Sequence, residues 1–407
     1  MPSKRFDFIT LQEALELLDV SRSTFDRWRR KKQLPYTKIG KEIMIDKNEL
    51  ERWFKLHASK RLEAPDAERQ EGRRTVAALQ PLVVNVGYQS RWAQIWTALM
   101  MKELGWFEEE LAKLIPERVV QVRWHDGAHG PALVQGMIGG HIQIASMGDY
   151  PISLAFSLSR LLPDFRPVLL AFDGKTAGGQ GISLVLGNNV DIRRPSRTSD
   201  LQIATVAQSS AGGRLSGLLH RFGTDDARIV HRDLDECMAD MARGAIGGGF
   251  MGEPYASLAR HYGLGSVVGA EGLGDDFLSG VVMEESWLAR HPAVGIAYLK
   301  AHLRVHRWVR RHLREAAELI ARVRRIPVKV AEDNLAKIRW DAAPYAKDIA
   351  ALERLNPGPE GAPPAFFMPD GEIRHDASFL MQAIRELRLP APTEGPIGGD
   401  WSAEQLY

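Results

Sequence analysis

Apolar residues near the start of the chain recur at helical spacing. Thr10 and Glu13 form a T-x-x-E capping pattern, which precedes an apolar face made by Leu11, Ala14, Leu15 and Leu18. Ser21 is a suitable N-cap for a second helix, and that helix would bury Phe25 and Trp28 before ending at "KQLP". The first sixty residues therefore begin with two short helices joined by a tight turn.

Alternation replaces the helical spacing after residue 35. The run "YTKIGKEIMI" (36–45) alternates around Gly40, which predicts a small β-hairpin. A third helix is expected from about Asn48, with Leu50, Trp53 and Phe54 on its apolar side. This order of helix, turn, helix and hairpin is that of a winged helix-turn-helix, in which the second helix enters the major groove of DNA.

From residue 82 onward, short β-rich runs alternate with helical stretches. Strands are predicted over 82–88, 119–124 and 141–148 and in "RPVLLAFDG", and the alternation begins again at "LQIATVAQSSAGGRLSGLLHRFG" (201–223). Such alternation favours parallel α/β sheets, which bind ligands beyond the carboxyl ends of their strands. Two similar α/β lobes joined by two crossings make a bilobal clamshell. We place lobe 1 at about 81–188 and 281–355, and lobe 2 at about 189–280.

Composition divides the chain in the same places. Residues 58–80 contain charges of both signs and no aromatic residue, as a linker does. We therefore predict a DNA-binding domain over 1–57, a linker over 58–80 and a sensor domain over 81–355. Residues 356–407 would be a proline-rich loop and a C-terminal helix packed on lobe 1.

Charge and cysteine content narrow the possible functions. The formal net charge is +2, yet the first sixty residues hold fourteen Lys and Arg against nine Asp and Glu, so the basic excess is local. The single cysteine, Cys237, permits neither an internal disulfide nor a cysteine-based zinc site. We see no apolar run long enough to span a bilayer and no secretory signal, and we expect a cytoplasmic protein.

The segments "TLQEALELLDVSRSTFDRWRRKKQLP" and "KIGKEIMIDKNELERWF" resemble the excisionase-type family, which is related to the DNA-binding heads of MerR-like regulators. The resemblance implies double-stranded DNA as a partner. A solvated basic helix on a protein-binding module is the alternative. Base contacts are expected near the front of the second helix, from Arg22, Ser23, Asp26 and Arg27. Phosphate contacts are expected behind them and in the wing, from Arg29, Arg30, Lys31, Lys38 and Lys41.

The body carries "VNVGYQSRW", "HGPALVQGMIGGHIQIASMGDYP", "IATVAQSSAGGRLSGLL" and "FMGEPYASLA". With these motifs it resembles the periplasmic-binding-protein fold, most closely the nitrate/sulfonate/taurine-type substrate-binding subunits of ABC transporters. The resemblance implies an α/β, type II-like clamshell behind the winged helix-turn-helix. Members of that family carry an export signal where this chain has a DNA-binding head, which favours sensing over transport.

Ligand contacts are expected from the loops at strand ends. The candidates are Gln89, Ser90, Trp92, His125, Asp126, Asp149, Tyr150, Ser209, Ser210 and Glu253. Ser209 and Ser210 open a helix whose free N–H groups favour an anion, although they could instead only cap it. Trp92 could equally be a core residue, and Glu253 a capping or hinge carboxylate. Serines for an anion together with a carboxylate for a cation would suit a zwitterion.

The sequence favours neither a metal site nor an enzyme active site. His125 and His129 stand four residues apart in "HDGAH", but the glycines around them indicate a loop that shapes the next helix, and we assign no metal and no cofactor. Pyrimidine-synthesising enzymes of this fold rely on a cysteine-rich motif that Cys237 alone does not supply, so no catalytic residue is assigned.

The sequence therefore predicts a one-component transcriptional regulator that senses a small anion or zwitterion and acts as a homodimer. The alternatives are an ABC-transporter-type solute-binding protein without a regulatory role, and an enzyme of the same fold.

Overall fold

In the computed structural model, the N-terminal region is described in part and the body over most of its length. The described residues are 8–18, 22, 25, 34, 36–39, 42–46, 49–50, 53, 81–178, 180–188, 190, 201–221, 227–268, 276–355, 373–390 and 395–407. All structural statements below concern these residues. None of their helices is both long enough and apolar enough to cross a membrane.

The N-terminal region contains a small antiparallel sheet beside a helix. Its elements are β1 (Phe8–Thr10), α1 (Leu11–Leu18), β2 (Thr37–Ile39) and β3 (Glu42–Asp46), with strand order β1-β3-β2. The predicted hairpin is present, with Thr37 opposite Met44 and Ile39 opposite Glu42. Strand β1, which the sequence pattern did not indicate, pairs with the outer edge of that hairpin. The buried residues are Ile9, Ala14, Phe25, Leu34, Ile45, Leu50 and Trp53, whereas Trp28 and Phe54 lie outside the described residues.

Lobe 1 is built on a six-stranded sheet of order β14-β7-β13-β6-β4-β5. Its strands are β4 (Leu82–Tyr88), β5 (Val120–Asp126), β6 (Ile144–Gly148), β7 (Pro167–Thr176), β13 (Phe277–Glu284) and β14 (Arg339–Trp340). Strands β5, β4 and β6 run parallel, whereas β13 is antiparallel to both β6 and β7. The sheet is therefore mixed and not purely parallel as predicted, because β13 returns from the other lobe.

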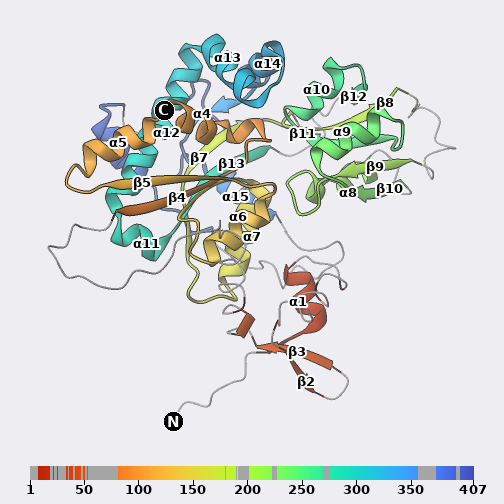
Figure 1. The fold of residues 1–407 in the computed structure, drawn as a ribbon, viewed down its shortest axis with the longest axis horizontal. Helices are drawn as coiled ribbons and strands as arrows, with labels where there is room; N and C mark the ends of the chain where they lie inside the picture. The colour runs from red at the N-terminus through yellow and green to blue at the C-terminus, as the bar shows by residue number, and fades with distance from the viewer. Residues whose placement is uncertain are drawn as a thin grey trace, which may run out of the picture.

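Helices cover both faces of this sheet (Figure 1). One face packs against α4 (Trp96–Leu104), α5 (Trp106–Leu114), α12 (Pro292–Arg311) and α16 (Ser378–Glu386). The other packs against α6 (Gly130–Ile138), α7 (Asp149–Ser159) and α15 (Ala346–Arg354). The remaining elements of the lobe are η1 (Ala93–Ile95), α11 (Glu285–Arg290), α13 (Leu313–Arg324) and α14 (Val328–Lys337).

Lobe 2 is smaller and has a five-stranded sheet of order β10-β9-β11-β8-β12. Its strands are β8 (Ile182–Gly187), β9 (Gln202–Thr205), β10 (Arg228–His231), β11 (Gly248–Gly252) and β12 (Gly265–Val268). Its helices are α8 (Gly212–Arg221), α9 (Leu234–Ala242) and α10 (Tyr255–His261). In Figure 1 the two sheets lie side by side with separate helical layers, as expected for a bilobal protein.

The lobe boundaries differ from those expected. Strand β8 pairs with β11 and β12, so lobe 2 begins near residue 182 and not at 189. Strand β13 pairs with β6 and β7, so lobe 1 resumes at Phe277 and not at 281. Strands β7 and β8 are both fully buried, and apolar character alone does not reveal which sheet such a strand joins.

The last residues of the chain lie against lobe 1. Helix α16 packs on α12, and Arg310 donates to the main-chain oxygen of Tyr407 at 2.8 Å. Lys175 is fully buried and pairs with Asp348 at 2.7 Å, while the Trp401 ring nitrogen donates to the same carboxylate. The expected proline-rich loop, 356–371, lies outside the described residues.

Candidate functional site: a cavity between the lobes

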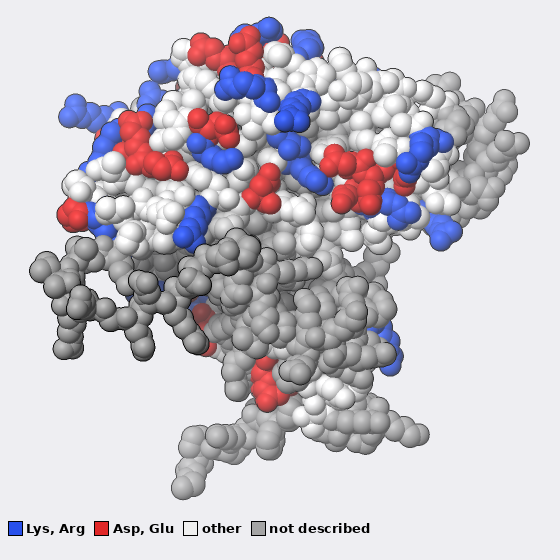
Figure 2. All heavy atoms as spheres, in the orientation of Figure 1, with Lys and Arg blue, Asp and Glu red and all other residues white. Residues whose placement is uncertain are grey.

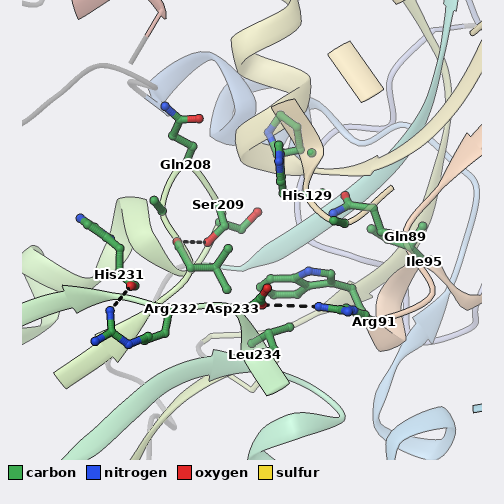
Figure 3. Close-up of a pocket in the computed structure, with 18 of the residues that line it drawn as sticks. Gln89, Arg91, Ile95, His129, Gln208, Ser209, His231, Arg232, Asp233 and Leu234 are labelled. Carbon is green, nitrogen blue, oxygen red and sulfur yellow. Dashed lines mark hydrogen bonds and ion pairs between the residues drawn. The ribbon is translucent and has the colours of Figure 1, made fainter. Parts of the chain in front are cut away.

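A cavity of about 340 Å³ is lined by residues of both lobes (Figure 3). Lobe 1 contributes the loop after β4, the loop before α6 and Phe277, and lobe 2 contributes the loops after β9 and β10. Apart from Phe277, which is the first residue of β13, these segments follow the carboxyl ends of strands, where a sheet with crossover connections places its ligands. In Figure 3, Gln208 and Ser209 lie across the cavity from Gln89 and His129.

Aromatic side chains form one wall. Trp92 and Phe277 have ring centroids 5.8 Å apart, inclined at 48°. Gly252 lies directly against the indole, because a Cβ added there would be only 2.1 Å from Trp92 Cζ3. Trp92 also belongs to the core cluster of lobe 2. It therefore fulfils both interpretations open from the sequence, as a packed core residue and as part of the cavity wall.

The start of α8 faces the cavity without an acidic residue in its first turn. The Ser209 hydroxyl donates to Val206 O at 2.7 Å and accepts from Gly212 N at 3.1 Å, so it caps the helix. Among the described residues, no hydrogen bond is recorded for the backbone N–H groups of Ser210 and Ala211. This end of α8 therefore has the polarity and the donors that an anion requires.

The start of α9 opens on the same cavity but carries its own acids. Asp233 and Glu236 form a reciprocal capping box. Arg91, from the lobe 1 loop after β4, reaches across to Asp233 at 3.5 Å (Figure 3). It also pairs with Asp235 at 3.1 Å. The positive end of α9 is therefore already compensated, and Arg91 links the two lobes beside the cavity.

His129 closes the opposite rim. Its ring nitrogen Nδ1 accepts from Ala132 N at 3.3 Å, so it caps α6, in line with the turn-shaping role expected from the sequence. On the lobe 2 side, Arg232 donates to His231 O at 2.9 Å and to Asp240 at 3.2 Å. The rim thus combines imidazole and guanidinium groups with neutral amides.

Four of the ten predicted ligand residues line the cavity: Gln89, Trp92, Ser209 and Ser210. The other six do not. Asp126 accepts from the Ser90 backbone N–H at 2.9 Å and its hydroxyl at 2.6 Å, and so fixes the loop that carries Gln89. His125 pairs with Asn85 at 2.9 Å, and burial holds its pKa below the usual value.

Asp149 and Tyr150 lie behind the cavity. The Asp149 carboxylate is fully buried and forms two contacts with Arg214 of α8, at 2.5 and 3.2 Å. The backbone N–H of Tyr150 also donates to that carboxylate at 2.7 Å. Asp149 thus meets a cation, as a buried charge must. The cation is a side chain of the other lobe, however, so the pair joins the lobes and the carboxylate faces a second, separate cavity of about 330 Å³.

Glu253 is buried outside the cavity. Its carboxylate accepts from Ser257 N at 3.0 Å, and burial raises its pKa above the ordinary range. Its main-chain oxygen accepts from Ala93 N of lobe 1 at 2.8 Å. Of the interpretations offered by the sequence, the geometry fits the capping or hinge carboxylate.

Sequence reasoning missed several cavity residues, namely Arg91, His129 as a lining group, Gln208, His231, Arg232, Asp233 and Phe277. Arg91 lies between two residues that were selected, and the D-x-x-E spacing of Asp233 and Glu236 was a usable helix-start signal. Phe277 carries no such signal, because it reaches the cavity only through the return of β13 to lobe 1.

The predicted DNA-contacting residues are described only in part. Arg22 is exposed and helical, and Lys38 belongs to β2 of the wing. Ser23, Asp26, Arg27, Arg29, Arg30, Lys31 and Lys41 lie outside the described residues. On the face of the body shown in Figure 2, acidic and basic side chains are interspersed over both lobes, without a broad patch of one sign.

In the described part of the chain, this cavity is lined neither by a reactive thiol nor by a cluster of side chains with metal-ligand spacing. Cys237 is buried, and desolvation raises its pKa to about 12. The pair His125 and His129 does not belong to a cluster with metal-ligand spacing. The cluster that does have such spacing, Asp173, His302 and His306, lies inside lobe 1.

Comparison with known proteins gives two separate matches. Residues 8–55 match the helix-turn-helix domain family. The body is 25% identical over 241 residues to a putative aliphatic sulfonates-binding protein of Bacillus subtilis, covering 58% of this chain and 69% of the relative. The head is an excisionase-type helix-turn-helix and the body is a binding-protein homologue.

Solved structures agree on the fold of the body. The alkanesulfonate-binding protein of Xanthomonas axonopodis, bound to MOPS, superposes with a TM-score of 0.54 at 18% identity, covering 68% of this chain and 91% of that one. The nitrate-binding protein of Synechocystis gives 0.57 at 15% identity, covering 76% and 90%. These likenesses confirm the predicted bilobal α/β fold of the periplasmic-binding-protein type.

Proposed function

We propose that this protein is a cytoplasmic one-component transcriptional regulator. Its head would bind double-stranded DNA, and its body would bind a small anion between the lobes. The observation that carries the proposal is the presence, in one chain, of a helix-turn-helix and a cavity that both lobes line. Because one head reads only a half-site, a homodimer is the expected working unit.

The chemistry of the cavity favours a sulfonate or a related oxyanion. The donors at the start of α8 supply positive potential, and Trp92 and Phe277 supply an apolar wall. Arg91 and Arg232 also lie at the rim, where acidic side chains pair with them. The relatives are described as binding sulfonates or nitrate. Because Asp233 on the cavity rim is already paired with Arg91, we favour an anion over a zwitterion.

An enzymatic role has less support. The thiol is buried and protonated at neutral pH, and the similar proteins are described as binding proteins. A binding protein without regulatory function remains the second candidate, because the body resembles such proteins over both lobes.

Calorimetry on the full chain tests the ligand. Ethanesulfonate and butanesulfonate should bind, and butyrate and taurine should bind at least tenfold more weakly. Carboxylates binding as tightly as sulfonates would refute the preference for a sulfonate.

DNA binding is tested separately by selecting sites from random DNA and measuring affinity against salt. Phosphate contacts predict a steep loss of affinity as salt rises. Arg27→Ala should alter site preference, whereas Lys41→Ala should weaken all sites alike. An affinity for DNA that depends neither on salt concentration nor on base sequence would exclude the proposed role of the head as a sequence-specific DNA-binding domain.

A further inference from the structure

Gly148 lies where the anion donors of the cavity meet its apolar wall. It is the last residue of β6 in lobe 1, and it lines the cavity together with Ser210 and Phe277. A Cβ added to Gly148 would be 2.9 Å from Ser210 Oγ and 3.3 Å from Phe277 Cε2 and Cζ. Any side chain at this position would therefore project between the start of α8 and the aromatic wall.

The backbone does not require a glycine at this position. Gly148 has φ −71° and ψ 172°, a conformation that residues with side chains also adopt. It is the N-cap of α7 and forms no side-chain capping bond, although Asn, Asp or Ser would stabilise an N-cap better. What the glycine provides is space beside the groups that line the cavity.

Gly252, at the end of β11, is the contrasting case. A Cβ there would be 2.1 Å from Trp92 Cζ3 and 2.4 Å from Trp92 Cε3, so the indole already occupies the space that the missing side chain leaves. At Gly148 the nearest groups are a hydroxyl and a ring edge, and both residues line the cavity. The space at Gly252 therefore serves packing between the lobes, whereas the space at Gly148 opens on the cavity.

We propose that Gly148 determines ligand specificity by admitting an oxyanion that carries an unbranched apolar tail, an inference that rests on the proposed function. The oxyanion would bind the N–H groups of Ser210 and Ala211 at the start of α8. The first carbon of the tail would pass Gly148, and the rest would lie against Trp92 and Phe277. Because the atoms that bound this passage lie only 2.9–3.3 Å from an added Cβ, one extra methyl group on the protein or on the ligand would close it.

Calorimetry on the full chain tests the tail directly, with methanesulfonate and butanesulfonate as ligands. They differ by three methylene groups, and each buried methylene strengthens binding about fourfold, so wild type should bind butanesulfonate at least about twentyfold more tightly. Gly148→Ala should bind methanesulfonate within about threefold of wild type, and its two affinities should differ by less than about threefold. Gly398→Ala is the matched control, because a Cβ there would meet no atom within 4 Å, and it should bind both ligands as wild type does.

A second measurement uses wild type alone, so it tests the proposal even if Gly148→Ala folds poorly. Propane-2-sulfonate carries on the carbon next to sulfur an extra methyl group, comparable to the one that Gly148→Ala adds to the protein. It should bind at least about tenfold more weakly than its unbranched isomer, propane-1-sulfonate.

Two results would overturn the role of Gly148 and leave the proposed function standing. One is a Gly148→Ala variant whose ratio of butanesulfonate to methanesulfonate affinity equals that of wild type. The other is equal affinity of wild type for the two propanesulfonates. A wild type that binds none of these sulfonates would instead overturn the proposed ligand class, and the role of Gly148 with it.

Discussion

Helices α8 and α9 begin at the same cavity, yet their first turns carry different chemistry. The start of α9 holds Asp233 and Glu236 and also attracts Arg91. The start of α8 has Ser209 as its cap and no acidic residue. Helix α7 resembles α9, because Asp149 in its first turn is paired with Arg214. Similar backbone geometry therefore yields an anion site only where the side chains leave the helix dipole uncompensated.

The largest effect is expected when the buried carboxylate at the start of α7 loses the cation that pairs with it. Arg214→Met leaves the fully buried Asp149 without its cation, which should lower the free energy of unfolding by about 3 kcal/mol. Denaturant titration measures the loss. The Arg243 side chain is 69% exposed, and its partner Asp240 also pairs with Arg232, so Arg243→Met should change the free energy of unfolding by less than about 0.5 kcal/mol. Equal effects of the two variants would show that the interlobe pair has no special role.

The second prediction concerns a variant that gives the start of α8 an acidic residue, as the start of α9 has. Ser209→Asp keeps a capping oxygen but adds a negative charge where the ligand would lie, so sulfonate affinity should fall at least about tenfold. Calorimetry measures it, and Ser286→Asp, in the first turn of α11, is the matched control that should leave affinity unchanged. Unaltered binding in Ser209→Asp would place the anion elsewhere.

The third prediction concerns a variant in which the acidic cap of α9 is replaced by a serine, as at the start of α8. Asp233→Ser keeps a good N-cap and removes one negative charge from the cavity rim, so sulfonate affinity should rise by about threefold. Asp235→Asn also frees Arg91 but lies outside the lining, and should change affinity less. A larger gain from Asp235→Asn would mean that release of Arg91, and not the charge at the rim, controls binding.

The smallest effect concerns Glu253, whose pKa burial raises. A raised pKa favours the protonated form in the folded state, so its stabilising contribution is present at low pH and is lost as pH rises through the raised value. Glu253→Gln should therefore match wild type near pH 4 and melt at a higher temperature near pH 8. The exposed Glu117→Gln controls for loss of charge. If the difference in melting temperature between Glu253→Gln and wild type became smaller as pH rises, the raised pKa of Glu253 would be contradicted.

Much of the fold follows from the sequence, because the hydrophobic alternation sets the strands and their carboxyl-end loops. That logic found Gln89, Trp92, Ser209 and Ser210. It failed for Asp149, whose partner Arg214 lies 65 residues away and is brought close only by the packing of the lobes. It also gave no indication that His302 and His306 would be buried beside Asp173, because histidines on a helix face have no distinguishing signal until their neighbours in the fold are known.

The central claim is that ligand and DNA binding are coupled in one chain. Coupling is reciprocal, so a sulfonate that changes operator affinity by some factor must have its own affinity changed by the same factor. The decisive measurement is calorimetric titration of sulfonate into the full chain, free and saturated with selected DNA, at one salt concentration. We predict a difference of at least about fivefold between the two dissociation constants. Identical constants would contradict the account and leave a binding protein whose head and cavity act independently.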